Sequence, residues 1–253
     1  MNEILQVAHL KKVFSRQDGP DIIAVDDVSF SLQKGEKLAI IGESGSGKTT
    51  VARMIARLLE ADAGSIMLDG EDITQAKGAK LKQAYTRMQM VFQNPQDSFD
   101  PRCTLGDGIS ESLSNHGKSK KQAADMTKNL LALCGLGEEF AHRYPHEVSG
   151  GQCQRAAIAR ALAIEPELVI LDEATSALDV TVQAEVLDLL NRLQQERGIA
   201  YLFICHDIAL VQDFCDRVIV MHNGRIVEEG TSDDVISNPQ QTYTKNLIDS
   251  VLM

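Results

Sequence analysis

A glycine-rich segment between an apolar run and an amphipathic run constrains this chain more than any other feature. Residues 42–49 read Gly-Glu-Ser-Gly-Ser-Gly-Lys-Thr and match the phosphate-binding pattern G-x-x-x-x-G-K-[ST]. Residues 37–41 before them predict a buried strand, and residues 49–59 after them carry apolar side chains at helical spacing. In that setting, backbone N–H groups and a helix N-terminus point at one phosphate. We expect Lys48 to reach the β- and γ-phosphate oxygens and the Thr49 hydroxyl to suit Mg²⁺.

A second apolar run ends in two carboxylates. Residues 168–171 are Leu-Val-Ile-Leu, and Asp172 and Glu173 follow directly. At the carboxyl end of a parallel strand, such a pair faces the ligand crevice. Taken alone, the pair fits an ordinary solvated strand end equally well. Beside the loop at residues 42–49, it predicts that Asp172 holds Mg²⁺ through water and that Glu173 accepts a proton from the attacking water.

Strand-like and helix-like segments alternate along the chain, which predicts an α/β fold with parallel strands. Residues 24–32 alternate apolar and polar side chains and predict a β-rich start. Further segments are predicted as strands at 65–68, 88–92, 168–171, 201–204 and 218–221, as a helix at 182–195, and as a hairpin at Asn223-Gly224.

Residues 94–163 show loop and helix patterns in place of the alternating strands and helices found elsewhere, which predicts a helical lobe inserted into the sheet domain. We therefore expect a single domain over residues 1–253. Its core lobe is formed by residues 1–93 and 164–230, its helical lobe by residues 94–163, and its short helical tail by residues 231–253.

Charge and composition exclude several classes of protein. The chain has 253 residues and a net charge of -11, which opposes general electrostatic binding to nucleic acid. No apolar run approaches the roughly 20 residues of a membrane span, and the N-terminus has no secretory pattern. The 5 cysteines include no C-x-x-C pair, so a disulfide framework or cysteine metal site is not expected and a reducing cytosol fits best.

A third motif resembles the signature of a known protein family. Residues 148–152 read Val-Ser-Gly-Gly-Gln and are followed by Gln154 and Arg155, which resembles the ABC-ATPase signature [LV]-S-G-G-Q-x-Q-R. The resemblance covers nearly the whole chain and extends to Phe14 as the adenine-stacking aromatic, Gln93 as the Q-loop glutamine, residues 176–179 as the D-loop and His206 as the switch histidine. It implies a P-loop NTPase core of the RecA-like type, with a β-rich N-terminal subdomain and an inserted α-helical signature subdomain.

The resemblance also implies a shared active site. Two subunits would face head to tail, with each MgATP held between the phosphate loop of one subunit and the signature turn of the other. The ATP contacts within one chain would be Phe14, Gly42, Glu43, Ser44, Gly45, Ser46, Gly47, Lys48, Thr49, Thr50 and Gln93. The contacts to the partner's ATP would be Ser149, Gly150, Gly151, Gln152 and Asp179. Glu173, His206 and Lys48 would be catalytic, and Thr49, Gln93 and Asp172 would serve the metal.

Residues 92–105 narrow the resemblance to the ATPases of oligopeptide, dipeptide and nickel importers. This implies a motor subunit at the cytoplasmic face of the cell membrane that drives uptake of a peptide, nickel or metallophore cargo. Its partners would be a second ATPase, two membrane permeases and, indirectly, an extracytoplasmic binding protein. The second ATPase is expected to be a paralogue, although an identical chain is possible. The segments around Pro95 and Pro101 would meet the membrane subunit.

Three alternative functions share part of this motif set. An ABC ATPase of an exporter is the nearest. An ABC ATPase of DNA maintenance would need a long heptad arm or a zinc module before the signature, and neither is present. A nucleotide-gated scaffold without turnover would be expected to lack an active carboxylate, whereas Glu173 and His206 are both present.

Overall fold

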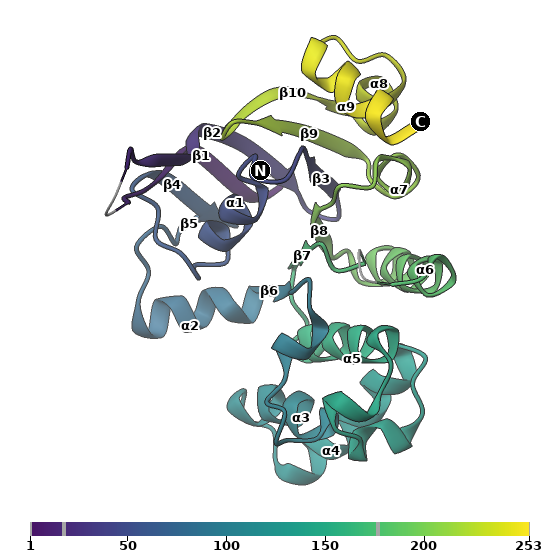
Figure 1. The fold of residues 1–253 in the computed structure, drawn as a ribbon. Helices are drawn as coiled ribbons and strands as arrows, with labels where there is room; N and C mark the ends of the chain where they lie inside the picture. Colours follow the sequence, from purple (N-terminus) through teal and green to yellow (C-terminus); the bar gives the residue numbers. More distant parts are fainter. Residues whose placement is uncertain (1, 17–18, 176–177, 253) are drawn as a thin grey trace.

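The computed structural model describes residues 2–16, 19–175 and 178–252, which form two sheets and a cluster of helices (Figure 1). The smaller sheet is antiparallel, with strand order β2-β1-β4-β5. Its strands are β1 (Glu3–Phe14), β2 (Ile22–Gln33), β4 (Ala63–Leu68) and β5 (Glu71–Asp72). The β-rich start predicted from the sequence is therefore present.

The larger sheet has six strands among the described residues, in the order β10-β9-β3-β8-β7-β6. From β9 to β6 the neighbouring strands are parallel, and β10 is antiparallel to β9. The strands are β3 (Lys37–Ile41), β6 (Met88–Val91), β7 (Leu168–Asp172), β8 (Ala200–Ile204), β9 (Arg217–His222) and β10 (Arg225–Thr231). The expected α/β fold with parallel strands is thus confirmed.

The larger sheet is buried on both faces, because its strands alternate their side chains between two cores. In β3, Leu38 and Ile40 join a core formed with the antiparallel sheet and α1 (Lys48–Ile55). Ala39 and Ile41 join the opposite core, which includes side chains of α5 (Gly150–Leu162), α6 (Val180–Arg197) and α7 (Ile208–Phe214). Both faces of the sheet are therefore covered, and the loops that follow its parallel strands converge at one edge of the sheet.

Helices α3 (Leu105–Asn115), α4 (Lys120–Leu133) and α5 gather at the bottom of Figure 1, where α5 packs against β6 of the larger sheet. The short 3₁₀ turn η1 (Pro95–Ser98) precedes α3, and η2 (Glu138–His142) and η3 (Pro145–Glu147) lie between α4 and α5. Thr104, Ser119 and Ser149 begin the three helices, and each does so with a reciprocal capping box. At the opposite end lie α8 (Ser232–Ser237) and α9 (Thr242–Leu252), in the segment where a short helical tail was expected.

Several predicted boundaries were wrong. The helix after the phosphate loop ends at Ile55, not near residue 59, because Arg57 adopts a left-handed φ of 56° that no α-helix accommodates. The strand predicted to end at residue 92 ends at Val91. The helix predicted at 182–195 is longer at both ends. Helix α2 (Gly78–Arg87) was missed because its apolar face is short: Ala84 is its only buried residue among those described, and Leu81 packs partly buried beside it.

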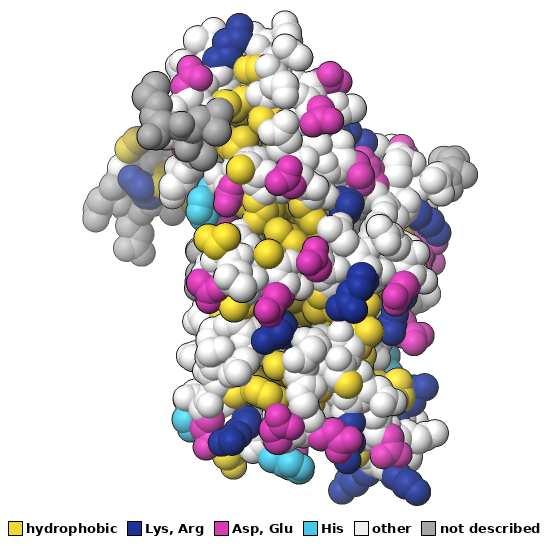
Figure 2. All heavy atoms as spheres, turned by 90° about the vertical axis from the view of Figure 1, so that its right-hand side faces the viewer, with side chains coloured by type: hydrophobic (Ala, Val, Ile, Leu, Met, Phe, Trp, Pro, Cys, Tyr) yellow, Lys and Arg dark blue, Asp and Glu magenta, His cyan; other side chains and the backbone are white. Residues whose placement is uncertain are grey.

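Among the described residues, no helix has the length and apolar character that a membrane span requires. On the face at the right of Figure 1, acidic and basic side chains alternate with apolar patches (Figure 2). The side chains described on that face form no continuous basic stripe of the kind that a phosphate backbone attracts.

Candidate nucleotide-binding and hydrolysis site

The predicted phosphate loop lies at the carboxyl edge of the larger sheet, between β3 and α1. Strands β7 and β8 run parallel to β3 and end at Asp172 and Ile204, so the residues that follow them emerge at the same edge. Parallel topology therefore brings Lys48, Glu173 and His206 into one region although they are far apart in the sequence.

Two glycines of the loop are required by close backbone contacts. A Cβ atom on Gly42 would lie 2.2 Å from the Met221 carbonyl oxygen, and one on Gly47 would lie 2.3 Å from the Ala24 carbonyl oxygen. Both glycines also have positive φ, at 146° and 105°. The loop is therefore pressed against β2 and β9, and only glycine fits at these two positions.

Lys48 is folded back onto the loop that carries it. Its side chain is buried, and Nζ donates to the carbonyl oxygens of Gly42 at 2.7 Å and Glu43 at 2.8 Å. Burial lowers the pKa of this ammonium group, while the charges of Glu173 and Asp172 oppose the shift. The ammonium group thus has neutral carbonyl partners that a phosphate oxygen can replace.

Thr49 and Asp172, two of the residues expected to serve the metal, are joined by a hydrogen bond. The Thr49 hydroxyl donates to Asp172 Oδ1 at 3.2 Å. Asp172 is buried at the end of β7, and burial raises the pKa of its carboxyl group while the Thr49 hydrogen bond lowers it. A hydroxyl and a carboxylate oxygen at one point suit a hard cation such as Mg²⁺, so the residues present fit that ion.

Glu173 is the centre of a cluster from three strand ends. Gln93 Nε2 donates to Glu173 Oε2 at 2.7 Å, and His206 Nδ1 lies 3.9 Å from the same oxygen. The Glu173 backbone has a left-handed φ of 49° and donates its N–H to the Ile204 carbonyl. A strained glutamate held this way is typical of a functional position.

Phe14 lies at the end of β1, opposite Ile22 of β2. The ring is 40% exposed, and Lys12 Nζ lies 5.7 Å from its centroid. An exposed face of this kind can stack a base. The contacts described for Phe14 are with its own sheet and do not reach the cluster around Lys48 and Glu173.

The signature turn lies in the helical cluster and not beside the phosphate loop of the same chain. Ser149 is the N-cap of α5, where its Oγ accepts from the Gln152 N–H and Gln152 Oε1 accepts from the Ser149 N–H. A Cβ on Gly150 would meet open space, whereas one on Gly151 would lie 2.4 Å from Val182 Cγ1 at the start of α6. In this turn, Gly150 therefore faces open space, whereas Gly151 is packed against α6.

Asp179 is the N-cap of α6, and its Oδ1 accepts from the Val182 N–H at 3.0 Å. The signature turn and this cap thus meet at Val182. Ser176 and Ala177 of the predicted D-loop, residues 176–179, lie outside the described residues.

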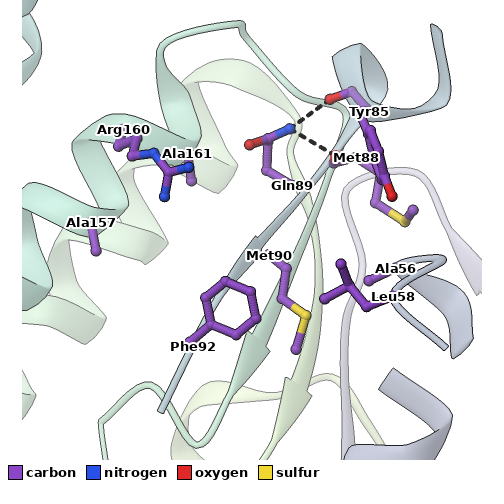
Figure 3. Close-up of a pocket in the computed structure, with 10 residues that line it drawn as sticks. All are labelled: Ala56, Leu58, Tyr85, Met88, Gln89, Met90, Phe92, Ala157, Arg160 and Ala161. Carbon is purple, nitrogen blue, oxygen red and sulfur yellow. Dashed lines mark hydrogen bonds between the residues drawn. The ribbon is translucent and has the colours of Figure 1, made fainter. Parts of the chain in front are cut away.

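Two features escaped the sequence reasoning. Tyr243 of α9 accepts a hydrogen bond from the Glu43 N–H of the phosphate loop at 3.1 Å, a contact that no local pattern signals. The second feature is a groove of about 260 Å³ between the core and α5 (Figure 3). Its lining is mainly apolar and consists of Ala56, Leu58, Tyr85, Met88, Gln89, Met90, Phe92, Ala157, Arg160 and Ala161.

Comparison with known proteins supports the interpretation that this site binds a nucleotide. A family model described as ABC transporter matches residues 25–176. The oligopeptide transport ATP-binding protein OppF of Bacillus subtilis is 46% identical over 252 residues, which cover 98% of this chain and 82% of that protein. The glutathione import ATP-binding protein GsiA of Pectobacterium atrosepticum is 47% identical over 255 residues, or 98% of this chain and 41% of that protein.

A solved dimeric structure of the ATP-binding cassette MJ0796, bound to ADP and Pi, superposes with a TM-score of 0.82 at 27% identity. The match covers 90% of this chain and 98% of that one. The family model spans more than half of the chain, and the OppF relative aligns along nearly all of it. With its phosphate loop, paired carboxylates and signature turn in one cassette fold, the chain belongs to the ABC transporter family as an ATP-hydrolysing ATP-binding subunit.

Proposed function

We propose that this subunit binds MgATP at residues 42–50 and hydrolyses it with Glu173 as the general base. The observation that carries the proposal is the convergence of Lys48, the Thr49–Asp172 pair and the Glu173 cluster at one sheet edge. The ammonium group of Lys48 exchanges its carbonyl partners for the β- and γ-phosphate oxygens. The exposed ring of Phe14 stacks the adenine.

Thr49, Asp172 and Gln93 would hold Mg²⁺, which when bound neutralises part of the phosphate charge. Gln93 donates through Nε2 to Glu173, so its Oε1 remains as an oxygen ligand. Glu173 takes a proton from the attacking water, and His206 contacts the γ-phosphate from the end of β8. The Gln93–Glu173 hydrogen bond joins the metal ligands to the proton acceptor.

A second ATPase subunit completes each site. Ser149 Oγ uses an acceptor lone pair in its capping box, so its hydroxyl hydrogen stays available to donate to a phosphate oxygen. The N–H groups at the start of α5 add the positive end of a helix dipole. Gly150 faces open space, which leaves room for the partner's nucleotide. We favour a paralogue as partner, with an identical chain as the alternative.

Gly151→Ala is expected to lower the ATPase rate of the assembled pair at least about tenfold, because its methyl group displaces the signature turn from Val182. The double variant Gly151→Ala, Val182→Ala makes room for that methyl group and should recover most of the rate. Phosphate release by the two variants, with Val182→Ala alone as the control, measures this. If the double variant is as slow as Gly151→Ala, the packing explanation is wrong.

We propose that the groove beside α5 receives an apolar-faced helix of a membrane permease. Leu58 is 53% exposed and lies among the other apolar side chains that line the groove, and such a patch suits a buried contact in the complex. Strand β6 lines the groove with Met88 and Met90 and leads directly to Gln93, so a helix seated here contacts the strand that precedes the Glu173 cluster. The segments around Pro95 and Pro101, which the family resemblance assigns to the membrane subunit, follow β6 in the chain. The helical segment 94–163 would act as the lobe that moves with the permease.

The cargo is proposed to be a peptide. OppF is named for oligopeptide transport and GsiA for glutathione import, and glutathione is a tripeptide. Neither name supports the nickel or metallophore cargo that the sequence motif left open. The subunit would then act at the cytoplasmic face of the membrane, with two permeases and an extracytoplasmic binding protein. No observation favours an exporter or a nucleic acid partner.

The proposed coupling is tested by Leu58→Glu in the complete transporter reconstituted in vesicles. We expect ATP-driven uptake of a labelled oligopeptide to fall at least about tenfold, because a carboxylate would be buried against an apolar helix. ATP binding by the isolated subunit should not change. Ala79→Glu, which places the same charge at an exposed position of α2, is the matched control and should transport normally. Normal uptake by Leu58→Glu contradicts the docking proposal, and uptake of Ni²⁺ but no peptide contradicts the cargo.

A further inference from the structure

The C-terminal helix reaches back to the phosphate loop. Tyr243, in the first turn of α9, accepts a hydrogen bond at 3.1 Å from the backbone N–H of Glu43, which lies 200 residues earlier in the chain. The loop that is expected to hold the nucleotide therefore has a hydrogen-bond partner from the tail as well as its own lysine.

The two partners hold opposite ends of one peptide group. The N–H of Glu43 and the carbonyl of Gly42 belong to the same peptide plane. Lys48 Nζ donates to that carbonyl at 2.7 Å, on one side, while Tyr243 accepts from the N–H on the other. Because each hydrogen bond polarises the peptide in the same sense, the two reinforce each other.

Tyr243 is itself fixed by the hairpin of β9 and β10. Its ring lies on the His222 ring with centroids 3.9 Å apart. The Glu228 carboxylate of β10 accepts from the N–H groups of Gln240 and Gln241, at 2.7 and 3.1 Å, just before α9 begins. Burial raises the pKa of the Tyr243 phenol, so the group stays protonated at neutral pH.

The same hairpin also touches the phosphate loop directly. The Gly224 N–H donates to the Ser46 carbonyl at 3.0 Å, and the Met221 carbonyl closes the space over Gly42. Hairpin, tail helix and loop are thus joined by several contacts on the outer side of the loop. Figure 1 shows α9 lying against β10.

We infer that Tyr243 is a positioning residue for ATP, whose hydroxyl keeps the Gly42–Glu43 peptide in its binding orientation when Lys48 leaves it for the phosphates. The inference rests on the proposed role of Lys48. In the nucleotide-free chain, Lys48 and Tyr243 both hold this peptide. In the nucleotide complex only Tyr243 does, so the loss of its hydroxyl weakens the bound form more than the free form.

Tyr243→Phe tests the inference because it removes the hydroxyl and keeps the ring on His222. Calorimetry on the full chain should show about threefold to tenfold weaker binding of ADP and of a non-hydrolysable ATP analogue, as expected for one net hydrogen bond. In the assembled transporter, KM for ATP should rise by the same factor while kcat stays within about twofold. The amide hydrogen of Glu43 should exchange faster in the free chain. The thermal midpoint without nucleotide should stay close to that of the parent.

Ser250→Ala is the matched control, because it also removes one hydroxyl from α9, where Ser250 donates to the Leu247 carbonyl of its own helix. It should bind nucleotide as the parent does. Parent-like affinity of Tyr243→Phe, or equal losses in both variants, overturns the inference. A fall in kcat without a change in KM overturns it as well. If Lys48→Ala also binds nucleotide normally, the proposed site itself is wrong, whereas a defect of Lys48→Ala alone disproves only the role of Tyr243.

Discussion

Glu173→Gln is expected to slow ATP hydrolysis about 10²–10⁴-fold while ATP remains bound, the usual effect of losing a positioned general base. Glutamine keeps the size of the side chain, and its amide oxygen can still accept the hydrogen bond from Gln93 Nε2. What it loses is the ability to take a proton from water. Because Lys48, Thr49 and Asp172 are untouched, the nucleotide contacts persist, and the interface that ATP completes should fail to open.

The measurement is size-exclusion chromatography with ATP and Mg²⁺, together with phosphate release, on this chain and its partner ATPase. We expect an ATP-dependent dimer that hardly turns over. Asp172→Asn should differ by weakening the Mg²⁺–ATP complex itself. Glu196→Gln makes the same chemical change on the exposed side of α6 and should hydrolyse ATP normally. Hydrolysis by Glu173→Gln at the parent rate would show that the base lies elsewhere.

The parts of the site that lie on contiguous residues were readable from the sequence. The glycine-rich loop follows a strand and precedes a helix as its pattern requires, and the loop glycines are confined by Met221 and Ala24. Asp172 lies at the end of a buried strand as the apolar run predicts. Here local pattern and tertiary structure agree, because each of the two motifs follows directly on the buried strand that positions it.

Residues from different strands were harder to combine. Gln93, Glu173 and His206 come together only because β6, β7 and β8 are neighbouring parallel strands. The sequence predicted parallel strands but not their order, so the family resemblance supplied the link. The roles assigned to these three residues stay predictions until the variants are measured.

Other elements could not be predicted because the controlling feature is a single backbone angle or a distant contact. Arg57 ends α1 with a left-handed φ that its residue type does not signal. His9 and Asp27 have positive φ of 53° and 61° where the register of β1 and β2 shifts, so the alternation of apolar residues is broken there. The Tyr243–Glu43 hydrogen bond links two ends of the chain. Such features become visible only in three dimensions.

Lys48→Ala is expected to weaken ATP binding by about 10²-fold and to abolish measurable turnover. Each charge-assisted hydrogen bond to a phosphate is worth about 1.5–3 kcal/mol, and two would be lost. The net effect is smaller than their sum because Lys48 gives up its bonds to the Gly42 and Glu43 carbonyls when it turns to the phosphates. No other lysine or arginine is part of residues 42–50, so nothing local replaces the charge.

Calorimetry with ADP and with a non-hydrolysable ATP analogue measures the loss, and Lys82→Ala, an exposed lysine of α2, is the control that should bind normally. The two ligands also separate the contributions of Lys48. If its ammonium group bridges the β- and γ-phosphates, the affinity for the ATP analogue should fall by a larger factor than the affinity for ADP, because ADP offers only the β-phosphate. Equal losses for both ligands would place Lys48 on the β-phosphate alone. Unchanged affinity for both would remove Lys48 from the site, and with it the assignment of residues 42–49 as the phosphate loop.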